Sequence, residues 1–346
     1  MDLREHEDKF FIYFRMSIKS FDELHERLKP SLQKKNTAMR DCIEPIQMLC
    51  VTLRYLASGC TFTDLHLQYR LGISTISGIV KDVCSTIWCL MLGECIPPPT
   101  KDKWESISTE FETRANFPHC IGAVDGKHIR ISNPLGSMYY NYKGYSSVVL
   151  MAVADANYRF VYVDIGSYGK DCDSSIFKRS SLWTSIINND HEIPIEKTVT
   201  GIDNCKLPYY FVGDEAFALH QHLLRPFGGS QLTIKKRIFN YRLSRARRYV
   251  ECTFGLLSNK WRILHRAINL EPDFAVIIVK ACVVLHNFVR DRDGYQVEDT
   301  DVIVGLDELP RERETRGGLP ANNVRNILSD YFMSNVGALP WQMLKI

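Results

Sequence analysis

The stretch Cys120-Ile-Gly-Ala-Val-Asp-Gly-Lys-His128 places an aspartate at the end of a short apolar run. The same arrangement occurs in Tyr209-Tyr-Phe-Val-Gly-Asp-Glu215, where Asp214 follows a second apolar run. Such runs are typical of buried strands, and a carboxylate at the end of a buried strand is costly unless it is paired or holds a metal ion. We therefore predict a sheet with Asp125 and Asp214 at one edge.

A third acidic residue, Glu251, lies in a run with helical spacing. Apolar residues recur at three- and four-residue steps from Val250 to Leu264, which predicts the buried stripe of a helix. Glu251 lies at the border of that stripe, and Arg247 and Arg248 lie one turn earlier on the same face. The helix can bring Glu251 to the sheet edge while the arginines face bound phosphates. Alternatively, the two arginines neutralise Glu251 within the protein.

Two strand-borne aspartates and a helix-borne glutamate suit two-metal phosphoryl transfer. Close carboxylates repel each other unless a divalent cation lies between them, and a pair of ions can activate a nucleophile and stabilise the leaving oxygen. Taken alone, Asp125 is equally a turn residue of Asp-Gly, and Glu251 a solvated helical residue. Together with Asp214 they predict a nuclease or transposase site that holds two divalent cations, with Asp173 as a candidate for orienting a metal water.

The net charge of +3 hides a strong segregation. The segment from Lys235 to Arg266 holds ten Lys and Arg residues against one acidic residue, Glu251. A basic block around a candidate catalytic carboxylate is expected for a polyanionic substrate, although charge runs are often solvated helix faces. The predicted DNA-binding residues are Lys143, Lys235, Lys236, Arg245, Arg247 and Arg248.

The composition predicts a soluble globular chain with two or three substructures, since 346 residues include 45% hydrophobic and 24% charged residues. We expect no signal peptide, because no basic stretch precedes an apolar one at the N-terminus. No apolar run approaches the roughly 20 residues that span a bilayer, so we expect no membrane partner. The eleven cysteines form no C-x-x-C pair and are interpreted as reduced thiols.

Residues 1–110 read as an all-α region. Helices expected near 61–70 and from Ser74 are joined by a short glycine-containing turn, which is a helix-turn-helix outline. Residues 1–110 contain 14 Lys and Arg against 15 Asp and Glu, whereas phosphate attraction supplies most non-specific DNA affinity. A packing subdomain or a dimerisation surface is an equally good interpretation, and we expect a homodimer.

From 111 to 290 the pattern alternates between strands and helices. We expect a strand over 119–131 that breaks after Asp125, a hairpin over 147–165, one helix from Asp173 to about 187, a strand over 209–213 and two long helices over 242–264 and 274–290. This order predicts an α/β, RNase H-like fold with a mixed five-stranded sheet and flanking helices. Residues 291–346 are interpreted as an acidic mobile linker followed by a short helix over 323–333.

A series of short motifs occurs in order through 120–290. These are Gly122-Ala-Val-Asp-Gly-Lys-His-Ile129, Tyr142-Lys-Gly-Tyr145, Asp173-Ser-Ser-Ile-Phe177, Val212-Gly-Asp214, Phe239-Asn240, Arg248-Tyr-Val-Glu-Cys-Thr-Phe-Gly255 and Leu285-His-Asn-Phe288. In these motifs the chain resembles the DDE endonuclease domain of the PIF/Harbinger transposases. Pieces of the first 110 residues also resemble the helical N-terminal region of that family.

The resemblance implies an RNase H-like, magnesium-dependent DNA endonuclease whose triad falls on Asp125, Asp214 and Glu251. It also implies a separate Myb/SANT-like protein that supplies much of the DNA binding and the nuclear import. We therefore expect the chain in the nucleus, with a cytoplasmic pool. A liberated 3′-hydroxyl would allow strand transfer. The alternative is a domesticated, catalytically silent scaffold associated with DNA or chromatin; an RNase rests on fold analogy alone.

Overall fold

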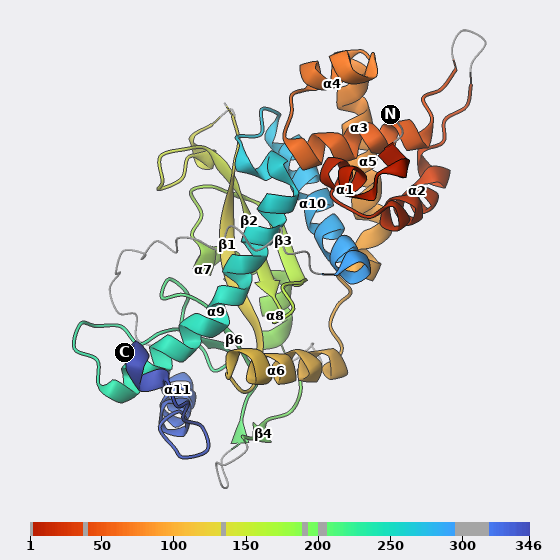
Figure 1. Ribbon diagram of the computed structural model, residues 1–346. Coiled ribbons are helices and arrows are strands. Elements are labelled where there is room, and N and C mark those ends of the chain that lie inside the picture. The colour runs from red at the N-terminus through yellow and green to blue at the C-terminus, as the bar shows by residue number, and fades with distance from the viewer. Residues whose placement is uncertain (1–2, 37–40, 133–135, 189–192, 200–205, 295–317) are drawn as a thin grey trace.

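A five-stranded mixed sheet lies at the centre of the computed structural model, which describes residues 3–36, 41–132, 136–188, 193–199, 206–294 and 318–346 (Figure 1). The strand order is β3-β2-β1-β6-β7. The bounds are β1 Cys120–Arg130, β2 Ser147–Ala154, β3 Phe160–Tyr168, β6 Tyr210–Val212 and β7 Leu223–Leu224. A separate two-stranded sheet pairs β4 (Lys197–Thr198) with β5 (Lys206–Leu207).

The pairing of β1 differs on its two sides. On one side β2 runs antiparallel and pairs with β1 from Ala123 to Arg130. On the other side β6 runs parallel and its last pairing joins Ala123 to Val212. The expected break of β1 after Asp125 is therefore wrong, because β2 holds the strand straight on to Arg130.

The helices around the sheet are α6 Lys101–Ala115, α7 Asp173–Arg179, α8 Ser181–Ile187, α9 Ile234–Lys260, α10 Pro272–Asp293 and α11 Leu319–Tyr331. The long helix α9 crosses the sheet and packs against β1 and β2 (Figure 1). The single helix expected from Asp173 to about residue 187 is instead two helices, because the extended backbone of Ser180 ends α7 and its side chain caps α8. This arrangement is a mixed α/β fold, consistent with an RNase H-like domain.

The first part of the chain is helical, as expected. Its helices are α1 Glu7–Phe14, α2 Ile18–Leu32, α3 Pro45–Ser58, α4 Phe62–Tyr69 and α5 Ile73–Cys95. Arg70 adopts the left-handed conformation between α4 and α5, so the two helices follow each other through a short turn. A DNA-reading role for this pair stays a proposal.

Two helices, α5 and α10, are long and apolar enough to cross a membrane by length and composition alone. In this structure they pack against each other (Figure 1). Buried residues of α5, among them Val80, Val83 and Ile87, and of α10, among them Ile278 and Cys282, belong to one apolar core. That packing accounts for their apolar composition.

Residues 295–317, which hold most of the expected linker, lie outside the described part of the chain. The expected terminal helix is α11, which begins at Leu319 and packs on α9. Buried Arg242 of α9 donates hydrogen bonds to the Gly337 carbonyl and to Gln342 Oε1, at 3.2 and 3.1 Å. The C-terminal segment is thus anchored to α9. The ten cysteines in the described residues are free, and five of them are buried.

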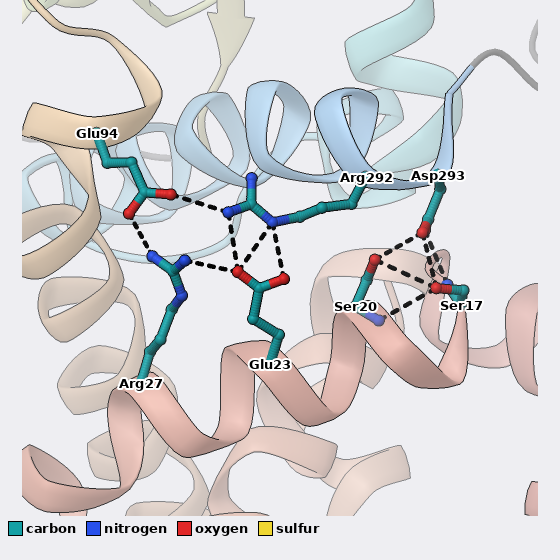
Figure 2. A network of polar contacts seen from close by, with 7 residues as sticks. All are labelled: Ser17, Ser20, Glu23, Arg27, Glu94, Arg292 and Asp293. Carbon is teal, nitrogen blue, oxygen red and sulfur yellow. Dashed lines mark hydrogen bonds and ion pairs between the residues drawn. The ribbon is translucent and has the colours of Figure 1, made fainter.

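A polar network ties the end of α10 to the N-terminal helices (Figure 2). Arg292 of α10 donates to Glu23 of α2 and to Glu94 of α5, at 2.9 and 2.8 Å. Arg27 bonds the same two carboxylates, so each glutamate is shared by two guanidinium groups. This closed set of opposite charges holds α2, α5 and α10 together.

Asp293 makes the second half of this connection (Figure 2). Its carboxylate accepts hydrogen bonds from the Ser17 backbone N–H at 2.8 Å, the Ser17 hydroxyl at 2.7 Å and the Ser20 hydroxyl at 2.6 Å. Ser17 is also the N-cap of α2, because its side chain accepts a bond from the Ser20 backbone N–H. One carboxylate at the end of α10 therefore fixes the start of α2.

We predict that Asp293→Ala lowers the free energy of unfolding by about 1–3 kcal/mol, because three donors lose a charged acceptor. Asp291→Ala on the same helix is the matched control, since its ion pair with Arg159 is partly exposed and should contribute less than about 1 kcal/mol. Urea unfolding of the full chain measures both. Equal losses for the two variants would contradict this role of Asp293.

Candidate active site

The two strand-borne aspartates lie where β1 and β6 separate. Ala123 and Val212 are the last paired residues of the two parallel strands, and Asp125 and Asp214 each lie two residues further along. Parallel neighbours present their carboxyl ends at the same side of a sheet, so these two side chains enter one opening. The predicted placement of Asp125 and Asp214 at one sheet edge is what the structure shows.

Local hydrogen bonds fix both aspartates. Asp214 is buried, and its Oδ1 accepts a hydrogen bond from the Ala216 backbone N–H at 2.9 Å. Asp125 is half-buried, and its Oδ1 accepts from the Gly126 backbone N–H at 2.9 Å. Each carboxylate keeps further acceptor capacity for a ligand.

A third aspartate reaches the same place from α7. Asp173 is the first residue of α7, and a Cβ atom added at Gly126 would lie 2.1 Å from its Oδ1. Only glycine therefore leaves room for the Asp173 carboxylate beside β1. From its sequence context Asp173 was predicted only to orient a metal water, because nothing in the linear pattern shows that α7 begins against Gly126.

The surroundings of Asp125 and Asp173 make ionisation of these two carboxyls difficult. Burial raises the pKa of Asp125 to about 7, and the charges of Asp173 and Asp214 act in the same direction. Burial likewise raises the pKa of Asp173 to about 6, with a further contribution from Asp214. The positive charge of Arg247 opposes the shift at Asp125, and that of Lys143 opposes it at Asp173. The opening thus concentrates negative charge in a poorly solvated place.

Glu251 lies on α9 and is engaged by an arginine. Arg247 Nη2 donates to Glu251 Oε1 at 2.7 Å, and the two side chains are 14% and 20% exposed. Because the charge of Arg247 also acts on Asp125, this guanidinium connects the glutamate to the aspartates. The pair is the internal neutralisation named above as an alternative. DNA contact by Arg247 stays a prediction.

The carboxylates have the chemistry of a site for Mg²⁺ or Mn²⁺, since these cations take oxygen ligands and would offset the mutual repulsion. Within the described ranges, however, no group of three or more His, Cys, Asp and Glu side chains is arranged to hold one ion. Asp125, Asp173 and Asp214 supply suitable donors, whereas Glu251 is turned to Arg247. The donor types fit a divalent cation.

The other predicted DNA-binding residues lie at different distances from the aspartates. Lys143 is exposed and close enough for its charge to affect Asp173. Lys235 and Lys236 lie at the start of α9, about 23 Å along the helix from Glu251. Lys235 pairs with Asp330 of α11, and the Lys236 Nζ lies 5.2 Å from the centre of the Phe227 ring.

Arg245 and Arg248 border a cavity next to α6, and the three aspartates are not among the residues that line it. The basic block is therefore divided over several faces of α9. The structure does not gather its charges around Asp125.

A family match covers the segment that holds these carboxylates. Residues 124–287, which include all three predicted triad positions, match the DDE superfamily endonucleases. This segment of the chain is similar to a DDE superfamily endonuclease domain. No solved structure matches it significantly.

Several relatives are similar to this chain along most of its length. "Protein ALP1-like" from Arabidopsis thaliana is 26% identical over 92% of this chain and 79% of that protein. "Putative nuclease HARBI1" is 26% identical in Rattus norvegicus, over 83% of this chain and 78% of that protein. The Homo sapiens protein of the same name is 24% identical, over 84% of this chain and 79% of that protein. The predicted resemblance to Harbinger-derived endonucleases is confirmed.

We predict that Asp125→Asn stabilises the cation-free protein, by about 1–4 kcal/mol near pH 8. The pKa of Asp125 is raised from 3.8 to about 7 in the folded state, so the folded chain binds the additional proton between these values. Wild-type stability should fall as pH rises from about 4 to 7 and level off above. The Asn variant lacks this loss, so its advantage grows across the same window.

Urea unfolding in EDTA across pH 4 to 8 measures this difference. Added Mg²⁺ should raise the thermal midpoint of the wild type and leave that of Asp125→Asn almost unchanged. An Asn variant that loses stability with pH in parallel with the wild type would show that Asp125 is an ordinary solvated carboxylate.

Proposed function

We propose that this chain is a divalent-cation-dependent DNA endonuclease of Harbinger transposase origin, with Asp125, Asp214 and Glu251 as its catalytic carboxylates. The observation that carries the proposal is the opening between β1 and β6, where Asp125 and Asp214 meet within the DDE endonuclease domain. Repulsion between buried carboxylates is the condition that a bound cation relieves.

When bound, two divalent cations would activate the attacking water and stabilise the leaving oxygen of the phosphodiester. The side chains of the protein prepare that chemistry. With its pKa raised to about 7, Asp125 is partly protonated near neutral pH and would release that proton when a cation binds. The Gly126 and Ala216 backbone N–H groups keep one oxygen each of Asp125 and Asp214 fixed. Asp173 adds a third carboxylate to the same opening.

Arg247 is the residue on which the state of Glu251 depends. In the ion pair, Glu251 is neutralised and less available as a ligand. We propose that a DNA phosphate competes with Glu251 for Arg247, so that the glutamate becomes free to bind a cation as the substrate binds. Strand transfer by a liberated 3′-hydroxyl would use the same carboxylates.

The second candidate function is a catalytically silent scaffold associated with DNA or chromatin. The observation in its favour is the same Arg247–Glu251 pair, which keeps one triad carboxylate occupied. A Myb/SANT-like DNA-binding companion, a homodimeric assembly and a nuclear location remain part of the proposal and fit both functions.

The test is nicking of a supercoiled plasmid by the full chain in Mg²⁺ or Mn²⁺. We expect the wild type to nick the plasmid. Asp125→Asn, Asp214→Asn and Glu251→Gln should each nick it at least about a hundredfold more slowly, which is the order of magnitude expected when a charged catalytic group is lost. These changes keep size and remove the charge that binds the cation.

Asp164→Asn on β3 is the matched control, because it removes a half-buried carboxylate from the same sheet outside the opening. It should nick at the wild-type rate. If all three triad variants nick the plasmid as fast as the wild type, the activity belongs to a contaminating nuclease. Folded, DNA-binding wild type without any nicking would favour the scaffold.

A further inference from the structure

A second polar cavity lies beside α9, at the end of α6 and the turn between β2 and β3. Its volume is about 200 Å³. The residues that define it are Arg114, Tyr158, Arg245, Arg248, Tyr249 and Cys252. We call this cavity the arginine pocket. The aspartates of the candidate active site are not among its lining residues.

The arginine pocket carries positive charge without a carboxylate in its lining. Three of its described lining residues are arginines, and none is Asp or Glu. Arg114 Nη1 donates to the Ala156 carbonyl and Arg245 Nη1 to Asn116 Oδ1, both at 3.2 Å. These acceptors are uncharged, so the bonds position two guanidinium groups and leave their charge in place. Guanidinium groups that converge in this way are suited to an anion with several oxygens.

Two tyrosines complete the wall of the pocket. The rings of Tyr158 and Tyr249 lie 5.1 Å apart between centroids. Tyr158 has a left-handed backbone with φ of 59°, a conformation that costs free energy in a residue other than glycine. Burial raises the pKa of Tyr249, and the charges of both Arg114 and Arg245 oppose that rise, which places the two cations near its ring. The phenols add neutral hydrogen-bond donors to the charged ones.

The pocket lies close to Glu251 along α9. Arg248 precedes Glu251 by three residues, which is about 4.5 Å along the helix axis and about 60° around it. A nucleic acid strand that crosses α9 can therefore place one phosphate near Glu251 and another at Arg248. The volume of the pocket admits a small anionic group and excludes a duplex.

We propose that the arginine pocket binds a backbone phosphate of the DNA substrate, next to the phosphodiester that is cleaved. The proposal rests on the nuclease function proposed above and adds a substrate-positioning site to it. Arg114 and Arg248 contact the phosphate oxygens, and Arg245, held by Asn116, completes the positive charge of the pocket. The pocket fixes the register of the strand without reading its sequence.

The first experiment measures the salt dependence of binding to a short fluorescent duplex without divalent cations, so that no cleavage intervenes. The double variant Arg114→Gln/Arg248→Gln removes two exposed charges. It should bind about tenfold more weakly at low salt and lower the slope of log affinity against log salt by roughly two. The control Lys9→Gln/Lys29→Gln removes two exposed charges from α1 and α2 and should keep the wild-type slope.

The second experiment distinguishes a phosphate on DNA from free phosphate. Inorganic phosphate should raise the thermal midpoint of the wild type and of the Lys9→Gln/Lys29→Gln control more than that of the double arginine variant. The assignment to DNA would be overturned if the shift of the thermal midpoint by inorganic phosphate depends on the two arginines while the salt dependence of duplex binding does not. Equal slopes and equal phosphate effects in all three proteins would overturn the pocket altogether.

These outcomes separate the pocket from the nuclease proposal. If the salt slope falls by about two in the double arginine variant but the wild type never nicks DNA, the pocket proposal stands and the nuclease function is rejected. Magnesium-dependent nicking by the wild type, with the same slope of log affinity against log salt in the wild type and the double arginine variant, would support the nuclease function and reject the pocket.

Discussion

Three aspartate carboxylates lie near the point where β1 and β6 separate, and the charge of Asp214 makes ionisation of Asp125 and Asp173 harder. Burial is the main cause of the raised pKa values of Asp125 and Asp173, and the neighbouring negative charges add to it. Such an arrangement costs folding free energy unless protons or cations neutralise it. The sheet, with β1 supported by β2 after β6 has ended, is what forces these side chains together.

The rest of the fold stabilises this costly site. Helix α9 buries a stripe that includes Val250, Phe254 and Leu257. This packing brings Arg247, which is paired with Glu251, close enough for its charge to act on Asp125. Helix α10 packs on α5, and its last residues bond α2 and α5 through carboxylate and guanidinium groups. The N-terminal helices thus act on the endonuclease domain as a packed support. That packing fits a region with nearly balanced charge better than it fits an independent DNA reader.

Much of the fold follows from local patterns in the sequence. The continuous apolar run of β2, which forms a hairpin with β3, and the apolar stripe of α9 are local patterns, and both elements were predicted. The continuation of β1 beyond Asp125 could not be predicted, because Asp-Gly reads locally as a turn and only pairing with β2 overrides it. Ser180 divides one expected helix into two by capping the second, which the apolar spacing does not reveal.

The candidate site shows the same division. Asp125 and Asp214 end apolar strands, which is a local signal, and so their meeting was predictable. Two other features depend on long-range packing, and no spacing in the sequence predicts them. Asp173 lies against Gly126, and Arg114 lines the same pocket as Arg248. The sequence left open whether Arg247 contacts Glu251 or DNA, and in the structure Arg247 donates a hydrogen bond to Glu251.

Proton release on cation binding tests the central claim most directly. Mg²⁺ is titrated calorimetrically into the full chain near pH 6.5, in buffers of different ionisation enthalpy. If the buried aspartates form the cation site, binding should release protons near pH 6.5, and the release should vanish above about pH 8 because Asp125 and Asp173 are then already ionised. Asp125→Asn should abolish most of it. Binding of Mg²⁺ with the same heat in every buffer, or no binding at all, would contradict the account.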